Sequence, residues 1–222
     1  MSHRQLQAVI FDMDGLIIDS EPLWKQAEFN VFSALGCEVT PQDQLKTACL
    51  STQNVTEYWF NKSPWHYQPK HQAEQAVIEE VEALLKNQCQ TKPGFFQALE
   101  LCRDLDLKIG LASNAPLRLC HTVAQILDCM DDFDCILSSE LVQNGKPAPD
   151  IYLHAIKTLD VAPKFALALE DSVTGATAAK AAGLKVIGVP SEPHYLEPML
   201  QLTDKILPSL SALRPHHLTG RV

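Results

Sequence analysis

The chain has 222 residues, of which 46% are hydrophobic and 20% charged, so it is long enough for one large domain or for a main domain with a smaller one. Its net charge of −9 argues against nucleic acid or an anionic membrane as the main partner. Seven cysteines without a C-x-x-C pair indicate neither a disulfide framework nor a zinc site, and the first residues lack the apolar segment of a signal peptide. We therefore expect a cytoplasmic protein, and a monomer is the default expectation.

The first predicted element is a buried strand, Ala8–Phe11, which is short, continuous and apolar. Asp12 and Asp14 follow at its carboxyl end, where open α/β sheets bind their ligands, and Gly15 allows a sharp turn. Taken alone, this stretch fits a polar turn as well as it fits a reactive site, because Asp and Gly are ordinary turn residues.

Helical patterns dominate the next part of the chain, up to about Thr91, and no parallel strand is evident there. The spacing of apolar residues predicts helical segments at Pro22–Leu35, Gln42–Cys49, Asn54–Phe60 and His71–Gln88. An insertion placed directly after a catalytic strand is positioned to cover the site. We therefore expect residues 19–91 to form an α-helical cap domain.

Predicted strands and helices alternate in the rest of the chain. The strands are expected at Lys108–Ala112, Cys135–Leu137, Ala166–Leu169, Lys185–Val189 and Lys205–Leu207. The helices between them are expected at Phe95–Leu105, Leu117–Leu127, Pro149–Leu159 and Thr174–Ala182. This alternation predicts an α/β fold in which residues 1–18 and 92–222 form a doubly wound, Rossmann-like parallel sheet that carries the inserted helical cap.

Polar residues follow three later segments of this core. Ser113 and Asn114 come after the second strand, where a helix cap is the ordinary interpretation. Lys146 lies between a glycine and two prolines, which fits either a surface turn or a fixed positive charge near a phosphate. Glu170 and Asp171 form a second acidic pair at a strand end, and a cap would explain only one of them.

Parallel strands present their carboxyl ends at one edge of a sheet, so all of these side chains should converge there. Four carboxylates in one place would repel each other without a cation, and an all-oxygen site completed by water and a substrate phosphate suits Mg²⁺. Asp12 could then attack a phosphoryl group and form an aspartyl-phosphate. Asp14 could serve as general acid and base, while Lys146 neutralises charge on the phosphoryl group.

At these residues the sequence resembles a known family. Asp12-Met13-Asp14-Gly15, Ser113, Lys146 and Glu170-Asp171 resemble the four ordered motifs of the haloacid dehalogenase (HAD) superfamily over nearly the whole chain. The insertion resembles the helical cap of its phosphoglucomutase-like branch. The string from Phe11 to Trp24, with Ala168–Ser172, is similar to the bacterial hexitol and 2-deoxyglucose-6-phosphate phosphatases. The resemblance implies a Mg²⁺-dependent phosphatase that hydrolyses small phosphorylated metabolites, above all sugar or sugar-alcohol phosphates.

The resemblance also implies a role for each matching residue. Asp12 would be the nucleophile and Asp14 the acid/base, and Ser113 and Asn114 would hold the phosphoryl oxygens. The metal ligands would be the Asp12 carboxylate, the Asp14 backbone carbonyl, Asp171 and, directly or through water, Glu170. In the cap, Glu21 is the residue that we expect to bond a substrate hydroxyl.

Three alternatives lead to different functions. β-Phosphoglucomutases of the same branch typically carry a histidine where this chain has Trp24, which favours hydrolysis over phosphoryl return. Haloalkanoic acid dehalogenases lack the second aspartate, so Asp14 argues against them. A binding protein that kept only the fold would be expected to have lost a motif, and none is missing here.

Overall fold

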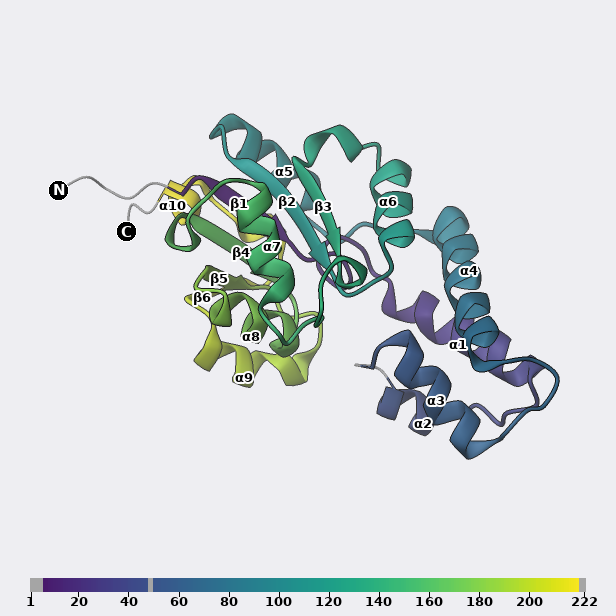
Figure 1. The fold of residues 1–222 in the computed structure, drawn as a ribbon. Coiled ribbons are helices and arrows are strands. Elements are labelled where there is room, and N and C mark those ends of the chain that lie inside the picture. The colour runs from purple at the N-terminus through teal and green to yellow at the C-terminus, as the bar shows by residue number, and fades with distance from the viewer. Residues whose placement is uncertain (1–5, 48–49, 220–222) are drawn as a thin grey trace. The chain divides into compact units, whose positions relative to one another are not determined.

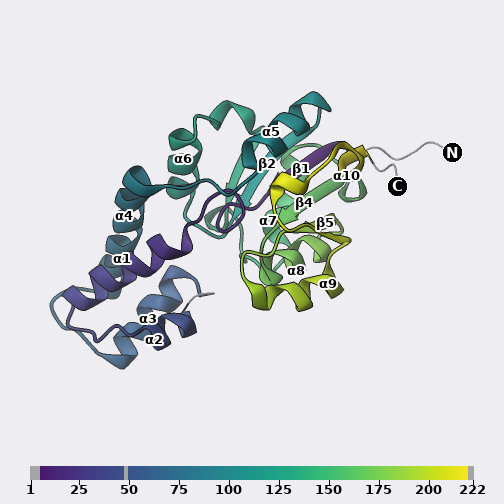
Figure 2. The ribbon, with the colours of Figure 1, turned by 180° about the vertical axis from the view of Figure 1, so that it is seen from behind.

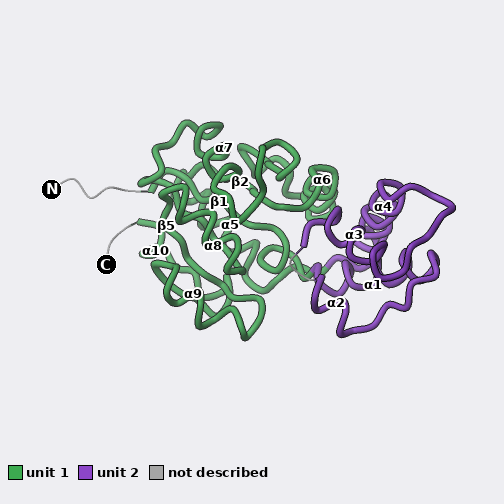
Figure 3. Tube along the Cα trace, turned by 60° about the horizontal axis from the view of Figure 1, so that its bottom comes forward, with its two compact units in different colours: residues 1–19, 90–222 green, residues 20–89 purple. Residues whose placement is uncertain are grey.

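A computed structural model describes residues 6–47 and 50–219 (Figure 1). The chain divides into two compact units (Figure 3): unit 1 consists of Met1–Asp19 with Gln90–Val222, and unit 2 of Ser20–Cys89. In the part of the chain that the structure describes, no helix has the length and apolar character needed to cross a membrane.

Unit 1 is built on a parallel sheet whose strand order, over the described residues, is β3-β2-β1-β4-β5-β6. The strands are β1 (Ala8–Phe11), β2 (Lys108–Ser113), β3 (Cys135–Ser138), β4 (Ala166–Glu170), β5 (Lys185–Gly188) and β6 (Lys205–Ile206). The predicted α/β class, a parallel sheet with an inserted helical segment, is confirmed. Strands β2, β3 and β4 each run one residue further than predicted, because Ser113 pairs with Ser138 and Glu170 with Gly188. Strands β5 and β6 each end one residue before the predicted end.

Helices cover both faces of the sheet, as predicted for a doubly wound fold. Side chains of a strand point alternately to the two faces. Ile10 packs in a core cluster with residues of α7 (Asp150–Thr158) and α8 (Val173–Ala181). The neighbouring Phe11 meets Phe95 of α5 (Phe95–Asp104) edge to face, with ring centroids 6.1 Å apart. Accordingly, α7 lies in front of the sheet in Figure 1 and α5 lies in front in Figure 2.

The remaining elements of unit 1 complete its periphery. The helices are α6 (Leu117–Ile126), α9 (Leu196–Leu202) and α10 (Pro215–Thr219). Short 3₁₀ turns lie at Met130–Asp132, Ser139–Leu141, Pro163–Phe165, Pro193–Tyr195 and Leu210–Ala212. Each cysteine that the structure describes, in either unit, is a free thiol.

Unit 2 consists of helices packed around aromatic side chains. Its helices are α1 (Glu21–Ala34), α2 (Pro41–Thr47), α3 (Thr52–Lys62) and α4 (Lys70–Gln88). Phe32 stacks on Trp59 with ring centroids 5.7 Å apart and lies 6.0 Å from the ring of Trp65. The last two residues of the helical segment predicted at Gln42–Cys49, Ala48 and Cys49, lie outside the described residues.

One carboxyl group is buried inside unit 2. Glu28 of α1 is 8% exposed, and Thr47 of α2 donates a hydrogen bond of 3.2 Å to its carboxylate. Burial raises the pKa of Glu28 from 4.5 to about 7, although the Thr47 bond and the charge of Lys25 oppose the shift. Between pH 4.5 and about pH 7, Glu28 of the folded unit therefore keeps a proton that it releases in the unfolded chain.

This proton makes the stability of unit 2 depend on pH. Between pH 4.5, the ordinary pKa, and about pH 7 the unfolded chain ionises Glu28 first, so stability falls as the pH rises through this window. Glu28→Gln, which mimics the protonated carboxyl, should remove this part of the pH dependence and stabilise the unit by about 1–3 kcal/mol at pH 8. The three tryptophans of the sequence, Trp24, Trp59 and Trp65, all lie in unit 2, so urea unfolding followed by tryptophan fluorescence reports on it.

The control is Glu79→Gln, which removes an exposed carboxylate from α4. It should leave the difference in midpoint between pH 5 and pH 8 as it is in the native protein. An equal pH dependence in the native protein and in Glu28→Gln would show that folding does not raise the pKa of Glu28.

Candidate active site

The register of the sheet places the ends of three strands at one level. Phe11 of β1 pairs with Leu111 of β2 on one side and with Leu169 of β4 on the other. The next residue, Asp12, therefore lies level with Ala112, the penultimate residue of β2, and with Glu170, the last residue of β4. Its N–H donates to the Leu169 carbonyl at 3.0 Å. The chain runs from β1 toward β3 and then returns to β4, so Asp12 lies at the switch point where open α/β sheets bind ligands.

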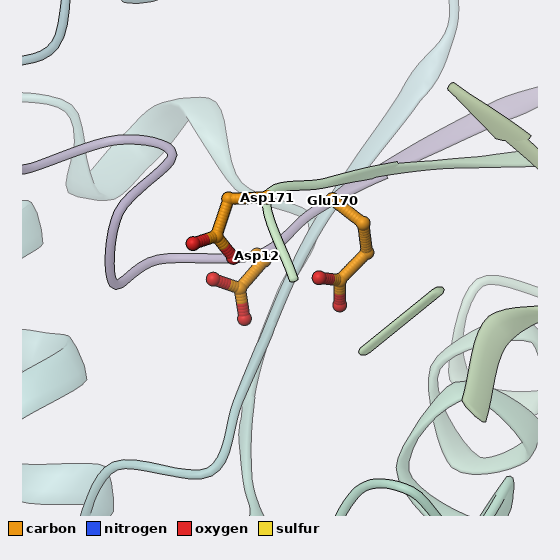
Figure 4. A group of neighbouring side chains, drawn as sticks. All are labelled: Asp12, Glu170 and Asp171. Atoms are coloured by element: carbon orange, nitrogen blue, oxygen red, sulfur yellow. The ribbon is translucent and has the colours of Figure 1, made fainter. Parts of the chain in front are cut away.

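Three carboxylates meet at this point. Asp12, Glu170 and Asp171 are all buried, and each has a carboxylate oxygen within 4.8 Å of an oxygen from the other two. Figure 4 shows the carboxylates of Asp12 and Asp171 side by side, with that of Glu170 across from them. Burial raises the pKa of Asp171 to about 7, and repulsion from Glu170 adds to it. Burial also raises the pKa of Asp12 well above its usual value, although Lys146 opposes the shift.

The chemistry of this group fits a hard divalent cation. The donors are carboxylate oxygens only, and a cation would offset both the burial and the mutual repulsion that raise the pKa values of Asp12 and Asp171. The buried acidic triad can therefore bind a metal ion.

Lys146 connects two of these carboxylates. Its Nζ donates to Asp12 Oδ1 at 2.5 Å, to Glu170 Oε1 at 2.6 Å and to the Ala112 carbonyl at 2.8 Å, so all three ammonium hydrogens have acceptors. Burial by itself would lower the pKa of Lys146, but the charges of Asp12 and Glu170 outweigh it and hold the pKa well above its usual value. The side chain therefore carries a fixed positive charge.

Two residues that the sequence patterns did not identify shape the surroundings of Glu170: Tyr152 bonds its carboxylate, and Gly175 leaves room for it. The hydroxyl of Tyr152, a fully buried residue of α7, donates to Glu170 Oε1, and Lys146 Nζ lies 5.0 Å from the centre of the Tyr152 ring. A Cβ on Gly175 of α8 would lie 2.0 Å from each oxygen of the Glu170 carboxylate, so only glycine fits there. Tyr152 reads in the sequence as one more apolar position of a helix, and Gly175 as a helix weakener.

The turn after β1 brings Asp14 and Gly15 to the same edge. Ser113 Oγ donates to Asp14 Oδ2 at 3.1 Å and accepts a bond of 3.0 Å from the Ala115 N–H. Gly15 has a φ of +80°, and a Cβ there would lie 2.2 Å from Asp171 Oδ2. The turn therefore requires glycine both for its left-handed backbone and for its close approach to Asp171.

The structure thus brings together the six side chains that were expected to converge at the carboxyl ends of the strands: Asp12, Asp14, Ser113, Lys146, Glu170 and Asp171. The Asn114 side chain bonds the backbone of Lys146. Glu21 belongs to unit 2, where it forms an ion pair with Lys25 at 2.5 Å, and its contact with substrate stays a prediction.

Comparison with known proteins adds independent information. The sequence model of the haloacid dehalogenase-like hydrolases matches residues 6–183. The chain is 38% identical to hexitol phosphatase B of Escherichia coli K12 over 98% of both chains. It is 30% identical to a phosphorylated carbohydrates phosphatase of Thermotoga maritima, over 82% of this chain and 84% of that one.

A solved structure also superimposes closely on the fold. It is a variant of CbbY from Rhodobacter sphaeroides in complex with xylulose-(1,5)bisphosphate, with a TM-score of 0.85 and 25% identity over 94% of this chain and 96% of that chain. The likeness extends over nearly the full length of both proteins.

Proposed function

Because the chain belongs to the haloacid dehalogenase-like hydrolase family, we propose that it is a Mg²⁺-dependent phosphatase that hydrolyses sugar or sugar-alcohol phosphates through an aspartyl-phosphate on Asp12. The observation that carries the proposal is the position of Asp12, whose carboxylate lies in the acidic group and also accepts a bond from Lys146. The names of the Escherichia coli and Thermotoga maritima relatives support the substrate class.

In the first half of the reaction, the Asp12 carboxylate attacks phosphorus and the bond to the sugar oxygen breaks. Lys146 places its charge beside the Asp12 carboxylate, where negative charge gathers on the transferring group. Water then attacks the phosphorus of the aspartyl-phosphate, which releases inorganic phosphate and restores Asp12.

The residues that would hold the metal are those named by the resemblance. Asp12 and Asp171 would offer carboxylate oxygens from the acidic group, and Glu170 of the same group would join them directly or through water. By the resemblance, Asp14 would add its backbone carbonyl. A Mg²⁺ ion held by these residues would supply positive charge that offsets the charge of the phosphoryl group. Ser113, which bonds Asp14, is the side chain that we assign to a phosphoryl oxygen.

Asp14 is assigned the proton transfers at the leaving oxygen. Asp14→Ala should lower kcat/KM for a sugar phosphate by about 10²–10⁴-fold, because an alkoxide leaves poorly without a proton. The loss for p-nitrophenyl phosphate should be at least tenfold smaller, about 10-fold or less, since its leaving group needs no acid. The comparison uses kcat/KM because this quantity ends at the first phosphoryl transfer and excludes the later hydrolysis step, in which Asp14 acts on both substrates alike. Equal losses in kcat/KM would contradict the assignment.

A hydrolysis screen tests the function itself. Phosphate release is measured with hexitol 6-phosphates, glucose 6-phosphate, 2-deoxyglucose 6-phosphate, phosphoglycolate and nucleotides, and isomerisation of β-glucose 1-phosphate is followed in parallel. We expect the highest kcat/KM among the sugar and hexitol phosphates. Isomerisation faster than hydrolysis would identify a β-phosphoglucomutase instead, and no turnover of any phosphate ester would identify a binding protein.

A further inference from the structure

The Asn114 side chain joins two loops of unit 1 that are far apart in the sequence. Asn114 directly follows β2, and Lys146 lies in the loop before α7. The Lys146 N–H donates to Asn114 Oδ1 at 2.8 Å, and Asn114 Nδ2 donates to the Lys146 carbonyl at 3.1 Å. One amide side chain thus pairs with both backbone groups of Lys146, as a neighbouring strand would.

The neighbouring glycine has the shape that this contact needs. A Cβ on Gly145 would lie 2.8 Å from Asn114 Oδ1 and 3.1 Å from Ser139 Cβ. Ser139 in turn donates from its hydroxyl to the Asn114 carbonyl at 2.9 Å, which fixes the backbone from which the amide projects. Gly145 and Asn114 therefore fit each other, and a side chain on Gly145 would push the amide away from Lys146.

Lys146 is consequently held at two points of different kinds. Its ammonium group bonds Asp12, Glu170 and the Ala112 carbonyl, and its backbone bonds Asn114. If Asp12 takes up a phosphoryl group, its carboxylate becomes an acyl phosphate. The bond that Lys146 donates then loses its charged acceptor. The backbone contact with Asn114 involves no reacting atom and can persist throughout.

We propose that Asn114 is a positioning residue. It keeps the charge of Lys146 in place while the Asp12 carboxylate is converted to an acyl phosphate and back. The inference rests on the proposed function, because it assumes that Lys146 acts on the phosphoryl group. It differs from the sequence-based expectation for Asn114, in which this side chain would itself hold a phosphoryl oxygen. Both polar atoms of the amide are already bonded to Lys146.

A double-mutant cycle distinguishes the two roles. In the native background Asn114→Ala should lower kcat by about 10–100-fold, since a displacement of about 1 Å can cost this much. In a Lys146→Met background, measured by single turnover at high enzyme concentration, the same change should alter the rate by no more than about twofold. The matched control is Asn144→Ala in the same loop; its exposed side chain bonds only Asp150 among the described contacts, and it should leave kcat nearly unchanged.

A second cycle tests the geometry with Lys146 intact. Gly145→Ala should lower kcat in the native protein but should have a clearly smaller effect in Asn114→Ala, because the tighter of its two contacts, with Asn114 Oδ1 at 2.8 Å, is then gone and only the contact with Ser139 Cβ at 3.1 Å is left of the two. Circular dichroism and thermal melting of each variant verify the fold.

The outcomes separate this inference from the proposed function. Equal factors for Asn114→Ala with and without Lys146, or a Gly145→Ala loss that is equally large with and without Asn114, would overturn the positioning role. A damaging Lys146→Met together with a harmless Asn114→Ala would also overturn it, and would leave the phosphatase proposal standing. A harmless Lys146→Met would remove the role of Lys146 and this inference with it.

Discussion

Asp12→Asn is expected to lower kcat by at least about 10³-fold, as the loss of a covalent nucleophile does in other enzymes. The carboxamide has nearly the same size and can still accept the bond that Lys146 donates at 2.5 Å, so the site should keep its shape. It carries no negative charge, however, and an amide oxygen is a poor nucleophile toward phosphorus. Phosphate release from the best substrate of the screen measures the effect.

Asp104→Asn serves as the matched control, because it removes an exposed carboxylate at the end of α5. This variant should hydrolyse substrate at nearly the native rate, and both variants should show native circular dichroism. Turnover by Asp12→Asn within about tenfold of the native rate would be far too fast for a lost nucleophile, and the covalent route through Asp12 would have to be abandoned.

Removal of divalent cations should abolish activity, and added Mg²⁺ should restore it. Without a metal ion, the single charge of Lys146 would have to offset three buried carboxylates, and a phosphate would add further negative charge. The measurement is phosphate release after dialysis against EDTA, before and after addition of Mg²⁺. A control with EDTA already saturated with Mg²⁺ shows whether the chelator itself inhibits.

Asp171 allows a more specific test of the metal site. Asp171→Asn replaces a charged oxygen donor by a neutral one, and should raise the Mg²⁺ concentration for half-maximal activity by at least about 10-fold. Full activity after exhaustive chelation, or an unchanged Mg²⁺ requirement in Asp171→Asn, would contradict the assignment of a metal to the acidic triad.

The main features of the core could be predicted because each depends on a short stretch of sequence. Ala8–Phe11 is continuously apolar, which a strand buried between two layers of helices requires. Once the strands are known, a parallel sheet gathers their carboxyl ends, and with them Asp12 and Glu170. The polar residues that lie at the ends of the strands thus predict which side chains meet.

What could not be predicted depends on contacts between distant segments. Tyr152 looks like any apolar residue of a helix face, and only the packing of α7 places its hydroxyl on Glu170. The two bonds between the Asn114 amide and the backbone of Lys146 become visible only when the loops are in place. Glu28 looks like a solvent-exposed residue of α1 until α2 covers it. Periodicity identifies elements, but it does not show which of their polar atoms will meet.

The central claim, a phosphoryl group carried by Asp12, can be tested directly by rapid acid quench during a single turnover. The enzyme is mixed with Mg²⁺ and the best substrate, quenched within milliseconds, digested and analysed by mass spectrometry. The proposed mechanism predicts one added phosphoryl group on the peptide that contains Asp12, formed and lost at rates that match the release of alcohol and of phosphate. A phosphoryl group on a different residue, or product formed with no phosphorylated peptide at any time, would contradict it.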